Sequence, residues 1–171
     1  MFRTTIKNNI YIAKALFTAL AISFLLVSCV DDRILFEETK VFDGKPWQRK
    51  DAVSFVFDVQ DSTQKHLISC YLKNLNDYQF CNLYIQYSIL DSTKKSIKNE
   101  IKDLMLYNPK TGEPFGKEEM FTDAQLGLYT LDSITFPSKG KYTILLQHHM
   151  RDLSSLDQIL SIGTQIKALP K

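Results

Sequence analysis

The sequence lacks an apolar run long enough to span a membrane. The apolar stretch from Ala15 to Val27 is thirteen residues long, whereas a helix needs about 20 residues to cross a bilayer. Arg3, Lys7 and Lys14 precede it, and no acidic residue does. A basic start, a short apolar middle and small residues at the end are typical of a secretory signal peptide. We therefore expect residues 1–28 to be a helical signal peptide that the mature protein no longer carries.

The end of this stretch resembles the bacterial lipoprotein box, as Leu26-Val27-Ser28-Cys29. In such signals a diacylglycerol is attached to the cysteine thiol, the chain is cut before the cysteine, and the new amino group receives a third acyl chain. The resemblance implies a mature protein that begins at Cys29. Several acyl chains hold a protein on a membrane stably, whereas one gives only marginal binding. The alternative is an uncleaved signal anchor with an incidental cysteine.

The mature chain also lacks a surplus of either charge. Three of the 21 Lys and Arg residues leave with the signal peptide, so 18 basic residues face 19 acidic ones. A nearly neutral chain offers no electrostatic grip on nucleic acid, and we expect no nucleic-acid partner. We expect residues 29–33 to form the lipidated N-terminus and a short tether. Residues 34–171 then suit one domain, large enough to bury a core.

No long segment of that domain follows a helical period, and the dominant period is two. Val53, Phe55, Phe57 and Val59 alternate with more polar residues, which predicts a strand with one buried face. Similar runs, separated by turn signals, are Ile34–Phe42, Leu67–Lys73, Cys81–Leu90, Ile97–Tyr107, Leu126–Phe136, Lys141–Met150 and Ile159–Ala168. About eight strands at this spacing predict an all-β protein, a single antiparallel β-sandwich of the jelly-roll or immunoglobulin-like type.

Two segments allow a second interpretation. Ile97–Tyr107 also fits a helical face, and Asp152–Leu160 could form one helical turn.

The two Asp-Ser-Thr-x-Lys stretches at Asp61 and Asp91 are interpreted as hairpin turns, in which the aspartate side chain caps its own backbone.

Catalytic and metal-binding motifs are missing. Adjacent strand residues point to opposite faces, so His148 and His149 cannot chelate one metal, and we expect one to pack and the other to be solvated. His66 follows a turn and is expected at an exposed strand edge. Ser154 lies outside any Gly-x-Ser-x-Gly motif, and none of the six glycines builds a phosphate loop. We therefore expect no enzyme, no metal and no cofactor, unless distant loops assemble a site.

Cysteine is scarce, and two residues remain besides Cys29. A hairpin turning at about residues 74–79 would place Cys70 nearly opposite Cys81, each on the apolar side, so a disulfide is feasible. Free cysteines in the core are the alternative.

Three aromatic residues are candidates for binding a partner. Tyr78 and Phe80 lie on the expected loop between two strands, and exposed aromatics anchor proteins or sugar rings. Trp47 follows a Gly-Lys-Pro turn. The alternative is that the loop folds its aromatics over the end of the sandwich and that Trp47 plugs the core.

Short stretches along the mature chain carry a resemblance to a known family. They are Cys29 followed by acidic residues, Phe36-Glu37-Glu38, Trp47 ahead of Val53-Ser54-Phe55-Val56-Phe57, Asp61, Asn74, Asn76-Asp77-Tyr78, Asn82-Leu83-Tyr84-Ile85, Gly112, Gly116, Phe136-Pro137, Gly140, Tyr142, Met150-Arg151 and Ile162-Gly163. Their joint order and spacing resemble the gliding-motility lipoproteins of the GldH type from Bacteroidetes. Lys73, Gln79 and Cys81 depart from the family's pattern.

This resemblance implies a non-enzymatic envelope component of the gliding machinery, tied to type IX secretion, with other envelope motility or secretion proteins as partners. Cys29 is the functional residue that it carries over. A surface lipoprotein that binds carbohydrate or protein without a role in motility is the alternative. Val30 after Cys29 resembles lipoproteins released to the outer membrane, while Asp31-Asp32 resembles the acidic signal for the cell surface. The periplasmic face and the cell surface both stay open.

Overall fold

The computed structural model describes residues 31–120 and 122–170, which hold eleven strands and no helix. This confirms the expected all-β class. No helix in these ranges could cross a bilayer. Residues from Arg33 onward form one compact unit. The expected signal peptide and Cys29 lie outside the described residues.

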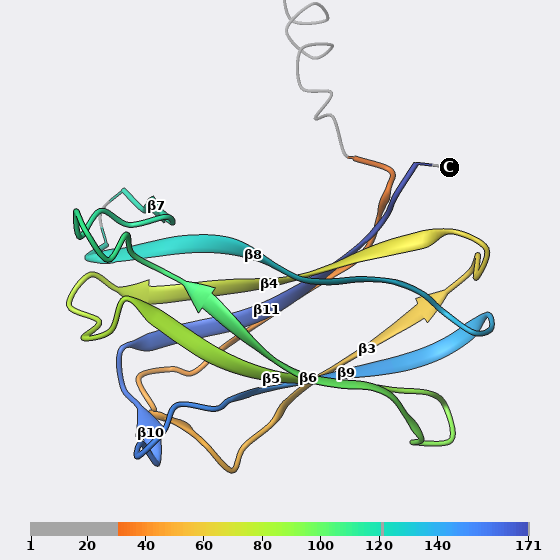
Figure 1. Ribbon diagram of the computed structural model, residues 1–171, viewed down its shortest axis with the longest axis horizontal. Helices are drawn as coiled ribbons and strands as arrows, with labels where there is room; N and C mark the ends of the chain where they lie inside the picture. The colour runs from red at the N-terminus through yellow and green to blue at the C-terminus, as the bar shows by residue number, and fades with distance from the viewer. Residues whose placement is uncertain (1–30, 121, 171) are drawn as a thin grey trace, which may run out of the picture. The chain divides into compact units, whose positions relative to one another are not determined.

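The long strands form two antiparallel sheets that pack face to face (Figure 1). The first sheet has the order β1 (Ile34–Val41), β11 (Ile159–Ala168), β4 (Lys65–Leu75), β8 (Ala124–Thr135) and β7 (Lys117–Glu118). The second has the order β3 (Val53–Val59), β9 (Gly140–His148), β5 (Asn82–Leu90) and β6 (Ser96–Met105). A small third sheet pairs β2 (Trp47–Gln48) with β10 (Ser155–Leu156).

The strand order identifies the sandwich as a jelly roll. When the eight long strands alone are numbered along the chain, one sheet reads 1-8-3-6 and the other 2-7-4-5. Two sheets wound in this way are the jelly-roll arrangement, which decides between the two sandwich types that the sequence allowed. Most neighbours in a sheet are therefore distant in sequence, as in the pairing of Ile34 with Lys167.

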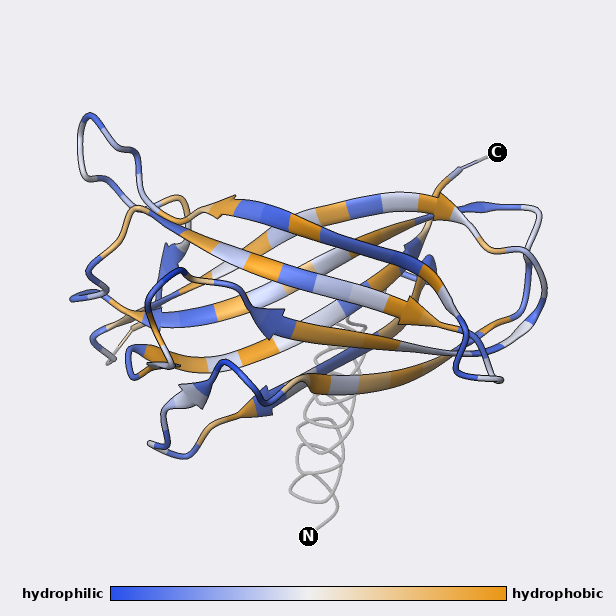
Figure 2. Cartoon of the chain, turned by 60° about the horizontal axis from the view of Figure 1, so that its bottom comes forward, coloured by the Kyte–Doolittle hydropathy of each residue, from blue (hydrophilic) through white to orange (hydrophobic). Residues whose placement is uncertain are grey.

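All eight predicted strands are present. The ambiguous segment at Ile97–Tyr107 is strand β6, and Asp152–Leu160 holds β10 and the start of β11 rather than a helical turn. Alternation explains this agreement, because apolar and polar residues alternate along much of the long strands (Figure 2).

The core lies between the two sheets and takes side chains from both. Phe57 of β3 contacts Phe136, which follows β8, with ring centroids 5.6 Å apart, and Tyr142 of β9 at 6.1 Å. These three rings are buried. Because one core joins both layers, neither sheet is stable without the other.

The two Asp-Ser-Thr turns have the expected local geometry. The Asp61 carboxylate accepts hydrogen bonds from the Thr63 amide (2.9 Å) and hydroxyl (2.6 Å). Asp91 accepts the same pair from Thr93, at 2.8 and 2.6 Å. Only the second turn closes a hairpin, between β5 and β6. The first is an arch that carries the chain from one sheet to the other.

The connections divide the sandwich into two unlike ends (Figure 1). We call one the short-turn end: it holds the turns 60–64, 91–95 and 136–139 and the start of β1. Backbone hydrogen bonds from Ala168 to Arg33 and from Leu169 to Lys65, both 2.8 Å, tie the chain's last described residues to it. The long-loop end holds the connections 42–52, 76–81, 106–123 and 149–158.

Candidate functional site

The two cysteines do not lie opposite each other. Cys70 of β4 pairs with Tyr129 and Thr164 in the first sheet, whereas Cys81 directly precedes β5 in the second. The expected hairpin is wrong because residues 76–81 form an arch between the sheets. Both cysteines are free; Cys70 is buried and Cys81 is exposed.

The candidate aromatics of the 76–81 arch face inward. Tyr78 is only 6% exposed, and its hydroxyl donates to the Asn82 carbonyl at 3.2 Å. Its ring packs edge-on against Phe80, with centroids 5.6 Å apart, and Phe80 itself packs against the core. Burial raises the pKa of Tyr78 above its ordinary value. The arch thus folds its aromatics over the end of the sandwich, as the alternative interpretation predicts.

Trp47 is a core residue rather than a surface anchor. Its side chain is 1% exposed, and its indole nitrogen donates to the Asp51 carbonyl at 3.0 Å. The ring stacks on Phe42 at 5.4 Å and meets His148 edge-on at 5.2 Å. Trp47 therefore holds the 42–52 loop against β9, as the core-plug interpretation predicts.

The histidines occupy apolar surroundings. His148 is buried and His149 is partly exposed, as expected for neighbours on a strand. His66 is also buried, which corrects its expected place at an exposed edge, because β4 lies between β11 and β8. Burial lowers the pKa of His66 below its ordinary value and that of His148 to about 4. Both rings are therefore neutral at pH 7.

Two carboxylates that are distant in sequence share partners between the sheets. Lys98 of β6 contacts Glu100 at 2.8 Å and Asp132 of β8 at 3.0 Å. The Tyr87 hydroxyl donates to the same two carboxylates, at 3.2 and 2.9 Å. The bond from Lys98 holds the pKa of Glu100 low. Burial alone would raise the pKa of Asp132. The hydrogen bonds from the Ser133 amide and from Lys98 lower this pKa by more, so that it lies below its ordinary value. Both groups are ionised, and the cluster links the two sheets.

No group of three or more metal-ligating side chains lies within residues 31–120 and 122–170.

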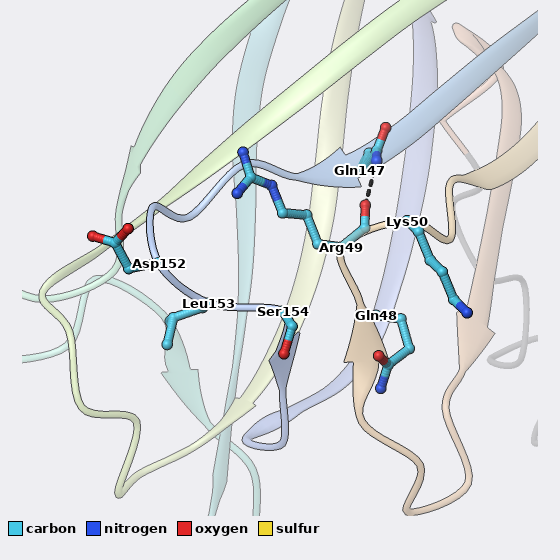
Figure 3. A pocket seen from close by; sticks show the side chains of 7 residues that line it. All are labelled: Gln48, Arg49, Lys50, Gln147, Asp152, Leu153 and Ser154. Carbon is cyan, nitrogen blue, oxygen red and sulfur yellow. Dashed lines mark hydrogen bonds between the residues drawn. The ribbon is translucent and has the colours of Figure 1, made fainter.

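An open hollow lies at the long-loop end (Figure 3). It has a volume of about 590 Å³ and is lined by Gln48, Arg49, Lys50, Gln147, Asp152, Leu153 and Ser154. The small sheet shapes its wall, because the Arg49 amide donates to the Ser154 carbonyl at 2.8 Å. The Gln147 side chain donates to the Arg49 carbonyl. Arg49 points away from Gln48 and Lys50, toward the side where Asp152 lies.

The side chains of this end suit contact with a protein. The Arg49 guanidinium makes no hydrogen bond or ion pair with a described residue, and so can take a carboxylate from outside. Phe115 and Met120 of the 106–123 connection are 58% and 83% exposed. Free Arg and exposed aromatic or Met side chains are enriched where proteins meet. This surface could hardly be predicted from the sequence, because loops carry no hydrophobic period.

Comparisons with known proteins agree on one family. The model of the family described as GldH lipoprotein matches residues 34–166, which hold all of the sandwich except the last two residues of β11 and do not include Cys29. The chain is 29% identical to "Gliding motility lipoprotein GldH" of Flavobacterium johnsoniae, over 85% of this chain and 91% of that protein. It is 26% identical to "Gliding motility lipoprotein GldH homolog" of Christiangramia forsetii, over 79% of this chain and 80% of that one.

Solved structures resemble the chain only distantly. An insecticidal delta-endotoxin of Bacillus thuringiensis gives a TM-score of 0.37 at 12% identity, and a 4-O-methyl-alpha-glucuronidase gives 0.41 at 12%. The alignments cover 74% and 81% of this chain, which spans only 20% and 17% of those chains. Similarity at this level carries no functional argument.

Proposed function

The chain belongs to the GldH lipoprotein family, and from this membership we propose that it is a lipid-anchored, non-enzymatic component of the gliding motility machinery that works with type IX secretion. The family match over nearly the complete sandwich carries the proposal. Relatives named as gliding motility lipoproteins support a role in motility.

The proposed anchor is Cys29, in the outer membrane. The basic start, the short apolar stretch and the Leu26-Val27-Ser28-Cys29 box support acylation at this residue. We expect radiolabelled palmitate to be incorporated into the wild type and not into Cys29→Ala. Equal labelling of the two proteins would reject the anchor.

The proposed contact with partner proteins is the long-loop end. The hollow beside Arg49 and the exposed Phe115 and Met120 support this choice. The carbohydrate-binding alternative relied on exposed Tyr78, Phe80 and Trp47, and these side chains pack in or against the core.

Site-specific photocrosslinking in living cells tests this contact. A photoreactive phenylalanine analogue replaces Phe115, and in the matched control it replaces Leu128, which is 49% exposed on β8. We expect motility or type IX secretion proteins to be captured from position 115 and not from position 128. Capture of neither class, or the same capture from both positions, would contradict the proposal.

Protease treatment of intact cells distinguishes the two faces of the outer membrane. Digestion of the domain means display at the cell surface, and protection means the periplasmic face.

A further inference from the structure

Charge is unevenly distributed between the two ends of the sandwich. The three turns of the short-turn end and their flanking residues (60–65, 91–95 and 136–141) carry only two acidic residues, Asp61 and Asp91. They carry five exposed lysines, namely Lys65, Lys94, Lys95, Lys139 and Lys141. None of these lysines forms a salt bridge with a residue that the structure describes. Their ammonium groups therefore face solvent.

The rest of this end leaves the positive surplus in place. The tether contributes Asp31 and Asp32 against Arg33, and the end of β11 contributes Lys167. Asp61 and Asp91 direct their carboxylates at the Thr63 and Thr93 of their own turns. With Asp58, which lies opposite Lys141 in the pairing of β3 with β9, this end carries seven basic and five acidic side chains.

The long-loop end has the opposite sign. Its four connections carry six basic and nine acidic residues. The sandwich is thus a dipole along the direction of its strands, although the net charge of the mature chain is close to zero.

The short-turn end is also the end next to the proposed anchor. Four residues lie between Cys29 and Ile34, and the five steps from one Cα atom to the next span at most about 18 Å. Since β1 starts at Ile34, a lipid on Cys29 holds the start of β1 close to a bilayer, and this step rests on the proposed function. The adjacent lysines then lie within reach of lipid headgroups.

We propose that the short-turn end is a membrane-contact surface that binds anionic phospholipid headgroups through Lys65, Lys94, Lys95, Lys139 and Lys141. Opposite charge brings the surface and the bilayer together, and each basic residue near such a surface contributes about a fivefold gain in membrane binding. The contact orients the domain, because it turns the acidic long-loop end away from the bilayer toward partners.

Vesicle sedimentation tests the surface without the lipid anchor. The probe is the chain from Val30 to Lys171, which contains the complete core unit. We expect it to pellet with phosphatidylcholine vesicles containing 30% phosphatidylglycerol and not with pure phosphatidylcholine. Raising the salt from 0.1 to 0.5 M should release it, because charges in solution are then screened within a few ångströms.

Matched charge reversals locate the contact. The variant Lys94→Glu, Lys95→Glu, Lys139→Glu should lower the partition coefficient at least about 30-fold. The control variant Lys50→Glu, Lys110→Glu, Lys117→Glu reverses three exposed lysines of the long-loop end and makes the same change in net charge. The partition coefficient of this control variant should fall much less than that of the short-turn variant. Circular dichroism of both variants checks that they fold.

Three results would overturn the proposal: no preference for anionic vesicles, an equal loss in the two variants, or salt-sensitive self-association of the chain without vesicles. The last would show that the basic end meets the acidic end of a second copy. Because this assay uses no acylated protein, palmitate labelling of Cys29 is an independent result, and either proposal can fail alone.

Discussion

The two described cysteines differ in burial and therefore in reactivity. Cys70 is fully buried, and burial raises the pKa of its thiol to about 12, so the reactive thiolate is scarce at pH 7. Cys81 is exposed on the 76–81 arch. We expect iodoacetamide to modify one thiol of the folded chain from Val30 to Lys171 quickly, and the second only after unfolding.

Single replacements assign the two phases of labelling. Cys81→Ser should remove the fast phase, and Cys70→Ser should leave it. If neither thiol reacts until a reductant is added, a disulfide joins them and the present assignment is wrong.

His148 makes stability depend on pH. Its pKa is about 4 in the folded chain and about 6.5 in the unfolded chain, so the unfolded state binds the proton more readily between these values. The stabilisation is complete above pH 6.5 and is lost as the pH falls toward 4. We expect the wild type to lose roughly 2 kcal/mol more than His148→Gln over this range, measured by urea unfolding.

His149→Gln is the matched control for this effect. It replaces the neighbouring, partly exposed ring and keeps the buried one, so most of the wild type's pH dependence should remain. If the unfolding free energy of His148→Gln falls with pH in parallel with that of the wild type, a group other than His148 causes the pH dependence.

At the scale of elements, Trp47 holds the small sheet of β2 and β10 to the sandwich. Its contacts with Phe42 and His148 fix the 42–52 loop, which in turn shapes the hollow. Trp47→Ala should cost about 3–5 kcal/mol of unfolding free energy, as for other large side chains removed from a core. Hydrogen exchange at the Arg49 amide should accelerate, because its bond to Ser154 depends on this packing.

Phe115→Ala provides the comparison for Trp47→Ala. Its side chain is 58% exposed, and its loss should change stability by no more than about 0.5 kcal/mol. Unchanged protection of Arg49 in Trp47→Ala would mean that backbone bonds alone hold the small sheet.

The eight long strands could be predicted because their side chains alternate, and alternation identifies the buried face. The same signal does not say which sheet the next strand joins. Cys70 and Cys81 were expected to face each other, and His66 was expected at an edge, for this reason. The strands β2, β7 and β10 have two residues each and cannot display a period. The hollow beside Arg49 lies on loops, so it could not be foreseen.

At the scale of the whole molecule, the jelly roll makes folding cooperative and slow. Partners such as Ile34 and Lys167 lie far apart in sequence, and one core joins both sheets. We expect urea transitions followed by Trp47 fluorescence and by far-ultraviolet circular dichroism to coincide, with refolding in milliseconds to seconds. Fluorescence that changes before the dichroism would show that the long-loop end unfolds by itself.

The path of β1 has a mechanical consequence. The strand begins next to the proposed anchor, ends at Val41 beside the long-loop end, and pairs with β11 along its length. Tension between a lipid at one end and a partner at the other would pull along β1. The hydrogen bonds to β11 run across that direction, so they would share the load in shear rather than open one after another.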